Sequence, residues 1–273
     1  MLGKQLTQAA AGSASAEVLY VDDVFSTHLI EGTGSAQTIN VGIDFAGEGG
    51  LVWFKNRDSS SDRHVLCDTE RGGPAKVVSA DRVDAEISYG TNVFGGFTST
   101  GYTTGTSGMT GGSGEKAVYW GFRRAPGFFD VVTYTGNGTA GRTVSHSLGS
   151  VPGAIWVKCT SHNNSWGCYH RSTGNTSCMF LNENIAPTSN STPWNNTDPT
   201  STEFTVGSDG QFNANGRTYV AYIFAHDDQS FGEDGDEAII KCDSYSGTGS
   251  TGFSVNVGFE PQFLIIKRTD SAE

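Results

Sequence analysis

Four side chains of the types that bind zinc lie close together near the middle of the sequence: Cys159, His162, Cys168 and His170. Two thiolates and two imidazoles form the ligand set of a tetrahedral zinc site. Their spacing differs from that of a zinc knuckle, however, and an earlier copy of the same segment lacks these residues. Polar loop residues beside a strand explain the pattern equally well. We therefore expect no metal and no cofactor.

An acidic cluster follows later in the chain. Asp227 and Asp228 precede the run Glu-Asp-Gly-Asp-Glu at 233–237. Carboxylates around a glycine turn can bind calcium, although the spacing of an EF-hand is absent. A solvated, charged loop between two repeats is the alternative interpretation, and the one that we favour.

A pair of carboxylates could cleave a polysaccharide by acid–base catalysis. The candidates are scattered through the chain: Glu70, Asp84, Glu86, Glu183 and Glu203. None of them belongs to a recurring motif, and the sequence contains neither a Gly-x-Ser-x-Gly nucleophile motif nor a phosphate-binding loop. We therefore predict a protein that is not an enzyme and has no catalytic residues.

Aromatic and amide side chains gather in a long segment that differs between the copies described below. Trp166, Tyr169, Trp194, Asn195 and Asn196 are of the types that bind sugars or protein surfaces from loops. The sequence predicts a binding site there. The alternative is that the tryptophans fill the interior of a β-sandwich.

The elements that position these residues are repeated. The apolar string at 51–55 (LVWFK) returns at 154–158 (AIWVK) and at 263–267 (FLIIK), at intervals of about a hundred residues. A closing strand with alternating large residues occurs at 118–122 and again at 219–224. The continuously apolar strings are typical of central strands that are covered on both faces.

These landmarks divide the chain into an arm (1–25), two β-sandwich repeats (26–128 and 129–236) and the start of a third repeat (237–273). Each complete repeat is expected to fold by itself. An isolated strand leaves an unpaired edge and half a core. The third repeat therefore requires either that the polypeptide continues, which we favour, or that its last strand completes another subunit.

The composition supports an all-β protein. Glycine is abundant, with 37 residues, and aromatic residues reach 11% in short strings separated by turn residues. The net charge of -12 and the absence of a basic cluster argue against nucleic acid as a partner. No apolar run is long enough to span a membrane, and no secretory signal is present, so we expect synthesis in a cytoplasm. The odd number of cysteines, five, favours reduced thiols.

Several strings resemble a known family when taken together. They are MLGK at 1–4, YVDDVFST at 20–27, GEGGLVWFKNR at 47–57, FRRAPGFFDVV at 122–132 and HSLGSVPG at 146–153. Nearly the whole chain resembles repeat proteins of marine tailed phages, especially cyanophages, that are described as tail-fibre-like or lectin-like. This resemblance implies a virion location and tandem antiparallel β-sandwiches of jelly-roll or concanavalin/laminin-G-like type. It implies no catalytic residue.

We therefore expect a virion structural protein, a subunit of a tail fibre or similar appendage that contributes to host attachment. Its arm, with Met1, Leu2, Lys4 and Leu6, is expected to bind other virion proteins. The resemblance implies a homotrimer, and the loops would bind a host glycan or protein. The alternatives are a capsid-decorating or head-fibre protein, a carbohydrate-binding module of a cellular surface protein, and a depolymerising tailspike.

Overall fold

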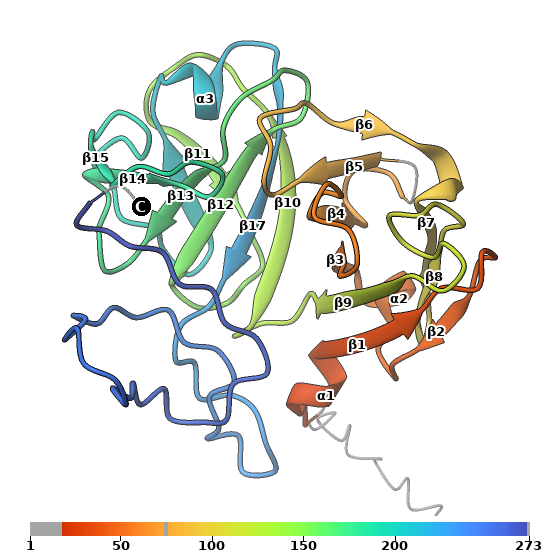
Figure 1. The fold of residues 1–273 in the computed structure, drawn as a ribbon. Coiled ribbons are helices and arrows are strands. Elements are labelled where there is room, and N and C mark those ends of the chain that lie inside the picture. The colour runs from red at the N-terminus through yellow and green to blue at the C-terminus, as the bar shows by residue number, and fades with distance from the viewer. Residues whose placement is uncertain (1–17, 74–75, 272–273) are drawn as a thin grey trace, which may run out of the picture.

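The computed structural model describes residues 18–73 and 76–271, and its fold is all-β with antiparallel sheets (Figure 1), as the sequence predicts. The predicted attachment residues Met1, Leu2, Lys4 and Leu6 lie outside the described residues. Helical elements in the described part are single turns: α1 (Val21–Val24), α2 (Phe45–Glu48), η1 (Gly90–Asn92) and α3 (Gly210–Asn213).

Residues 25–123 form unit 1. Its six-stranded sheet runs in the order β1 (Phe25–Glu31), β9 (Lys116–Arg123), β3 (Gly50–Asn56), β4 (Val65–Asp68), β5 (Lys76–Ser79) and β6 (Ile87–Ser88). A smaller sheet pairs β2 (Thr38–Asn40), β8 (Gly101–Thr104) and β7 (Phe94–Thr98). Strand β9, the last strand of unit 1 along the chain, thus lies between β1 and β3.

Residues 129–224 form unit 2, which repeats this topology. Its large sheet runs in the order β10 (Phe129–Thr135), β17 (Thr218–Phe224), β12 (Ala154–Cys159), β13 (Gly167–His170), β14 (Ser177–Phe180) and β15 (Thr188–Ser189). The smaller sheet pairs β11 (Arg142–Ser145) with β16 (Glu203–Val206). The sequence repeat is therefore also a repeat of strand order.

Each unit buries its own core between its large and small sheets. In β3, Val52 and Phe54 belong to the core of unit 1, together with Tyr102 and Tyr119. Strand β12 contributes Ile155 and Val157 to the core of unit 2 in the same way. Alternate residues of a strand point to opposite faces, so the remaining residues of β3 and β12 point away from these two cores.

Some of those remaining residues belong to a third core, the inter-unit core, where the two large sheets pack against each other. It contains Leu51 and Trp53 of β3, Ala154 of β12, and Tyr222 and Phe224 of β17. The rings of Trp53 and Trp156 meet at 6.2 Å between centroids, in an edge-to-face arrangement. The apolar strings are thus covered on both faces, as predicted, but the second face is covered by the other unit. The two units pack side by side (Figure 1).

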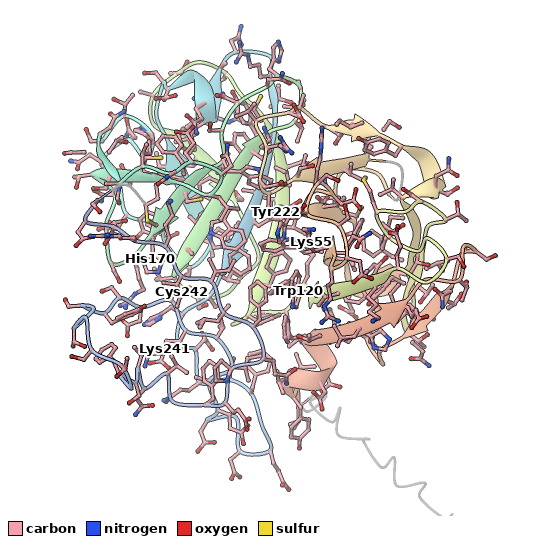
Figure 2. All side chains as sticks on the ribbon, viewed as in Figure 1. Lys55, Trp120, His170, Tyr222, Lys241 and Cys242 are labelled. Carbon is pink, nitrogen blue, oxygen red and sulfur yellow. The ribbon has the colours of Figure 1, made fainter. Side chains whose placement is uncertain are left out.

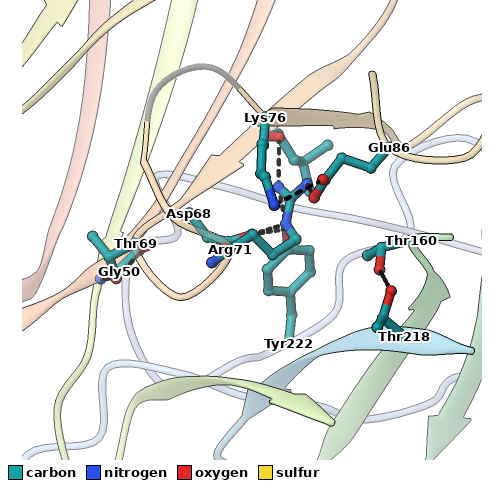
Figure 3. A network of polar contacts seen from close by, with 10 residues as sticks. Gly50, Asp68, Thr69, Arg71, Lys76, Glu86, Thr160, Thr218 and Tyr222 are labelled. Carbon is teal, nitrogen blue, oxygen red and sulfur yellow. Dashed lines mark hydrogen bonds and ion pairs between the residues drawn. The ribbon is translucent and has the colours of Figure 1, made fainter. Parts of the chain in front are cut away.

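A buried polar network crosses this contact (Figure 3). Asp68 accepts hydrogen bonds from Arg71 Nε at 2.6 Å and from the Tyr222 hydroxyl at 2.7 Å. Arg71 also contacts Glu86 at 3.2 Å, and the side chains of Asp68 and Arg71 are almost fully buried. Burial and the neighbouring Asp68 carboxylate raise the pKa of Tyr222 well above its ordinary value, so the hydroxyl remains a donor. The network thus ties β17 of unit 2 to unit 1.

Residues 237–271, called here the third segment, contain no strand among the described residues. The string at 263–267, predicted as a strand, is irregular. The topology explains this difference. In each complete unit the first three strands pair only with later strands, such as β1 with β9 and β3 with β4 and β9. The described part of the third segment holds counterparts of the opening strings but none of the strands that pair with them.

Four histidines make the fold sensitive to acid. The pKa values of His64, His146, His170 and His226 are all lowered by burial. In each of them Nδ1 accepts a hydrogen bond, from Trp53 Nε1 or from the backbone N–H of Leu148, Ser172 or Cys242. A doubly protonated imidazole cannot accept these bonds.

We therefore expect the melting temperature to fall as the pH drops from 7.5 to 5. Below about pH 6.5 the unfolded chain binds protons that the folded chain resists, so stability must decrease in this window. Hydrogen bonding lowers the pKa of the exposed carboxyls of Asp243 and Asp270, so these two groups titrate at lower pH. Differential scanning fluorimetry of the wild type and of His64→Gln, which keeps an acceptor without the titration, measures the effect. An unchanged melting temperature over this range would contradict the prediction.

Candidate functional site

A hollow of about 440 Å³ opens at one end of unit 2. Three loops and one strand end line it, with both polar and apolar residues: Ser150, Val151, Pro152, Tyr169, Arg171, Asp198, Pro199 and His226. His170 and Cys242, labelled in Figure 2, belong to the segments that adjoin this rim. The volume falls within the range of small-ligand sites.

The sheet register holds these residues together. Tyr169 lies opposite Ile155 on β12, and the backbone N–H of Arg171 donates to the carbonyl of Gly153 at 2.9 Å. A Cβ atom at Gly153 would meet the Cβ atoms of His226 and Cys242 at 2.7 Å. Glycine is therefore needed here for the close approach of the chain segments. The hollow stands on the ends of β12, β13 and β17, which are rigid core strands.

The hollow carries one cationic side chain, Arg171, and one carboxylate, Asp198. Arg171 is exposed, and no salt bridge joins it to a carboxylate among the described residues. Asp198 accepts a hydrogen bond from Asn175 Nδ2 at 2.6 Å, which orients its carboxylate. Burial and Arg171 lower the pKa of His226. Because its Nδ1 accepts the N–H of Cys242, the neutral ring carries its proton on Nε2 and can donate there.

The structure separates the five residues that the sequence predicted as a binding site. Tyr169 alone lines the hollow. Trp166 is fully buried, and its Nε1–H donates to the carbonyl of Ser79 in unit 1 at 2.8 Å. Trp194 is buried in the core of unit 2, where its ring contacts Tyr169 and Phe212. The prediction is therefore wrong for both tryptophans as ligand-facing rings, because Trp166 fills the inter-unit core and Trp194 the core of unit 2.

Asn195 and Asn196 lie elsewhere, beside a second hollow of about 260 Å³. Both adopt a left-handed backbone conformation, with φ of 52° and 51°, which asparagine tolerates better than most residues. The sequence does not show that these two asparagines lie away from Tyr169.

Arg171, Asp198 and His226 were missed by the sequence analysis. The first two lie in the same variable segment, so composition located the region but not the residues.

The zinc-type side chains do not converge. Cys159 is buried in the core of unit 2, and burial raises the pKa of the Cys168 thiol, which hydrogen-bonds within its own strand region. In the part of the chain that the structure describes, no group of three or more His, Cys, Asp or Glu side chains is arranged to hold a metal ion. All five cysteines are free, as the odd count suggested.

Three of the candidate catalytic carboxylates are engaged by cations. Glu70 pairs with Arg124 at 2.8 Å, and Asp84 pairs with Arg63 at 2.6 Å. Glu86 contacts both Arg71 and Lys76, as part of the network that joins the units. These carboxylates hold the fold together at separate places, so the geometry offers no acid–base pair among them.

The fold and the hollow define a double β-sandwich protein with a ligand-sized depression on its loop end. The chain matches the family described as Domain of unknown function (DUF7483) over residues 21–273, and it belongs to that family. The match extends over both units and the third segment. No curated protein and no solved structure matches the chain. Within the described residues, no helix has the length and apolar character needed to cross a bilayer.

Proposed function

We propose that this chain is a non-catalytic structural subunit of a tailed-phage virion, in a tail fibre or similar appendage, and that it contributes to host-surface attachment. The observation that carries the binding role is the hollow lined by Tyr169, Arg171, Asp198 and His226. Loops on a rigid β-scaffold commonly carry recognition sites. The resemblance of the sequence to phage repeat proteins supports the virion role.

The ligand that suits the hollow best is a host-surface glycan with an acidic sugar. The Arg171 guanidinium can form paired hydrogen bonds with a sugar carboxylate. The Asp198 carboxylate and the His226 Nε2–H offer an acceptor and a donor for hydroxyl groups. Val151, which is 56% exposed, offers apolar surface at the rim, whereas Tyr169 and Pro152 are buried lining residues.

Replacement of Arg171 tests the binding role. Arg171→Ala should weaken the affinity for an acidic host polysaccharide by roughly 10- to 100-fold, since a charge-assisted hydrogen bond contributes about 1.5–3 kcal/mol. Isothermal titration with purified polysaccharide measures the change. Arg82→Ala is the matched control, because Arg82 is an exposed arginine of unit 1. Equal losses in the two variants would contradict a specific site at the hollow.

Deletion of residues 2–17 tests the attachment role of the arm. The truncated protein keeps all the described residues of the three cores, so we expect it to retain its melting temperature but to be lost from purified phage particles. Mass spectrometry of the particles measures incorporation, and light scattering tests the proposed homotrimer. Antibody labelling of the tail would support an appendage subunit, and labelling of the head would assign a capsid-decorating or head-fibre protein. Absence of the intact protein from particles would contradict the virion role and favour a cellular carbohydrate-binding module.

A further inference from the structure

The apolar residues of the third segment fall into two sets when they are matched to their counterparts in units 1 and 2. The first set packs against the inter-unit core. It comes from the same repeat positions that fill this core from the two complete units. The equivalent positions are Val24, Phe128 and Ile239; Phe25, Phe129 and Ile240; and Leu51, Ala154 and Phe263.

Phe263 shows how closely this set is integrated. Its ring lies 5.4 Å from the rings of Trp120 and Phe122 and 5.8 Å from that of Trp53. A ring from the third segment thus closes an aromatic cluster on unit 1. The inter-unit core therefore has three contributors that use equivalent residues.

A polar contact between units 1 and 2 recurs between unit 2 and the third segment. Lys158 of unit 2 donates from Nζ to the carbonyl of Val83, in the loop between β5 and β6 of unit 1, at 2.9 Å. Lys267, its counterpart in the third segment, donates to the carbonyl of Glu183, in the matching loop between β14 and β15 of unit 2, at 2.8 Å. The third segment therefore docks on unit 2 as unit 2 docks on unit 1.

The second set of apolar residues is exposed. Leu264 and Ile266 are 64% and 61% exposed, and Tyr245 and Phe253 are about half exposed. Their counterparts in unit 2 are all buried in its own core: Ile155, Val157, Tyr134 and Val144. In unit 2 these residues are covered by strands from the later part of the unit, including β16 and β17.

We propose that the third segment is the opening part of a third sandwich, placed with units 1 and 2 around the inter-unit core in a pseudo-threefold ring, and that its exposed apolar face is a docking site for a partner polypeptide with a strand of the β17 type. The strand that it needs first is of the β17 type, because β17 pairs with both β10 and β12. In unit 2, Phe224 of β17 lies opposite both Phe129 and Ala154. With the same register, the equivalent residue of the partner strand lies opposite both Ile240 and Phe263.

The chemistry of this partner strand follows from β17. Tyr219, Ala221 and Ile223 face the core of unit 2, and Tyr222 and Phe224 face the inter-unit core. A partner must therefore carry about seven residues that are apolar on both faces. The inter-unit core supports this choice of partner. In unit 1 the equivalent place is filled by β9, between β1 and β3, and in unit 2 it is filled by β17, between β10 and β12.

A peptide of residues 216–226 with lysine flanks tests this on the intact chain. We expect one peptide per chain to bind and to slow amide hydrogen exchange at 239–246 and 263–267. The double variant Leu264→Asp/Ile266→Asp should keep its melting temperature, because both side chains are exposed, but bind the peptide at least about tenfold more weakly. A peptide with Ala221→Pro should not bind, because proline interrupts the ladder of a central strand.

Three results would overturn the proposal. The first is that the peptide leaves hydrogen exchange unchanged, and the second is that it protects the wild type and the double variant equally. The third result is that the protein without peptide forms an oligomer in which residues 263–267 are already protected. The last result would identify a second copy as the occupant.

Discussion

Residues 127–273, expressed without the preceding half of the chain, should not form a stable monomer. This fragment contributes six buried aromatic side chains to the inter-unit core: Phe128, Phe129, Trp166, Tyr222, Phe224 and Phe231. At roughly 1.5–3 kcal/mol for each large apolar side chain, their exposure removes on the order of 10 kcal/mol. A typical domain has a net stability of about 5–15 kcal/mol.

The measurement compares three samples by urea unfolding and light scattering. The fragment alone should lack a cooperative monomeric transition, and an equimolar mixture with residues 1–126 should recover one as a one-to-one complex. The control is the intact chain cut at a protease site introduced after Pro126, which is exposed. Its halves should stay associated. A fragment that unfolds cooperatively near the midpoint of the intact chain would show that unit 2 is independent, as the sequence alone suggested.

Asp68→Ala should lower the free energy of unfolding by about 3–5 kcal/mol, because it leaves the Arg71 guanidinium buried without its anion. The Asp68 and Arg71 side chains are 0% and 3% exposed, so water cannot replace the missing partner. The Tyr222 hydroxyl loses its acceptor in the same change. For a chain of this size, the loss corresponds to roughly 10 °C in melting temperature.

Arg63→Ala provides the matched control. Arg63 and Asp84 form an ion pair with the same 2.6 Å distance, but both side chains are about one third exposed. Exposed pairs contribute about 0–1 kcal/mol, so the melting temperature should change little. Similar losses in Asp68→Ala and Arg63→Ala would show that burial of the network at the unit contact has no special weight.

Much of the local structure was predictable. The apolar string at 51–55 and its copy at 154–158 both form central strands, and the closing strings at 118–122 and 219–224 lie within β9 and β17. Side-chain alternation and turn residues are local properties, so the pattern of the chain reports them directly. The residues that line the hollow were predicted less well, because a tryptophan in a loop-rich segment can point inward or outward. Trp166 points inward, to a carbonyl of the other unit.

The sequence by itself determined the all-β class, the duplication and the location of the main strands. Only the tertiary structure decided what covers the second face of each large sheet. A continuously apolar strand such as Leu51 to Phe54 shows that both faces are buried, but it does not identify the surface that buries them. The same limit explains residues 263–267. Their composition favours a strand, but a strand forms only beside a partner, and in unit 2 the equivalent strand β12 pairs with the later strands β13 and β17.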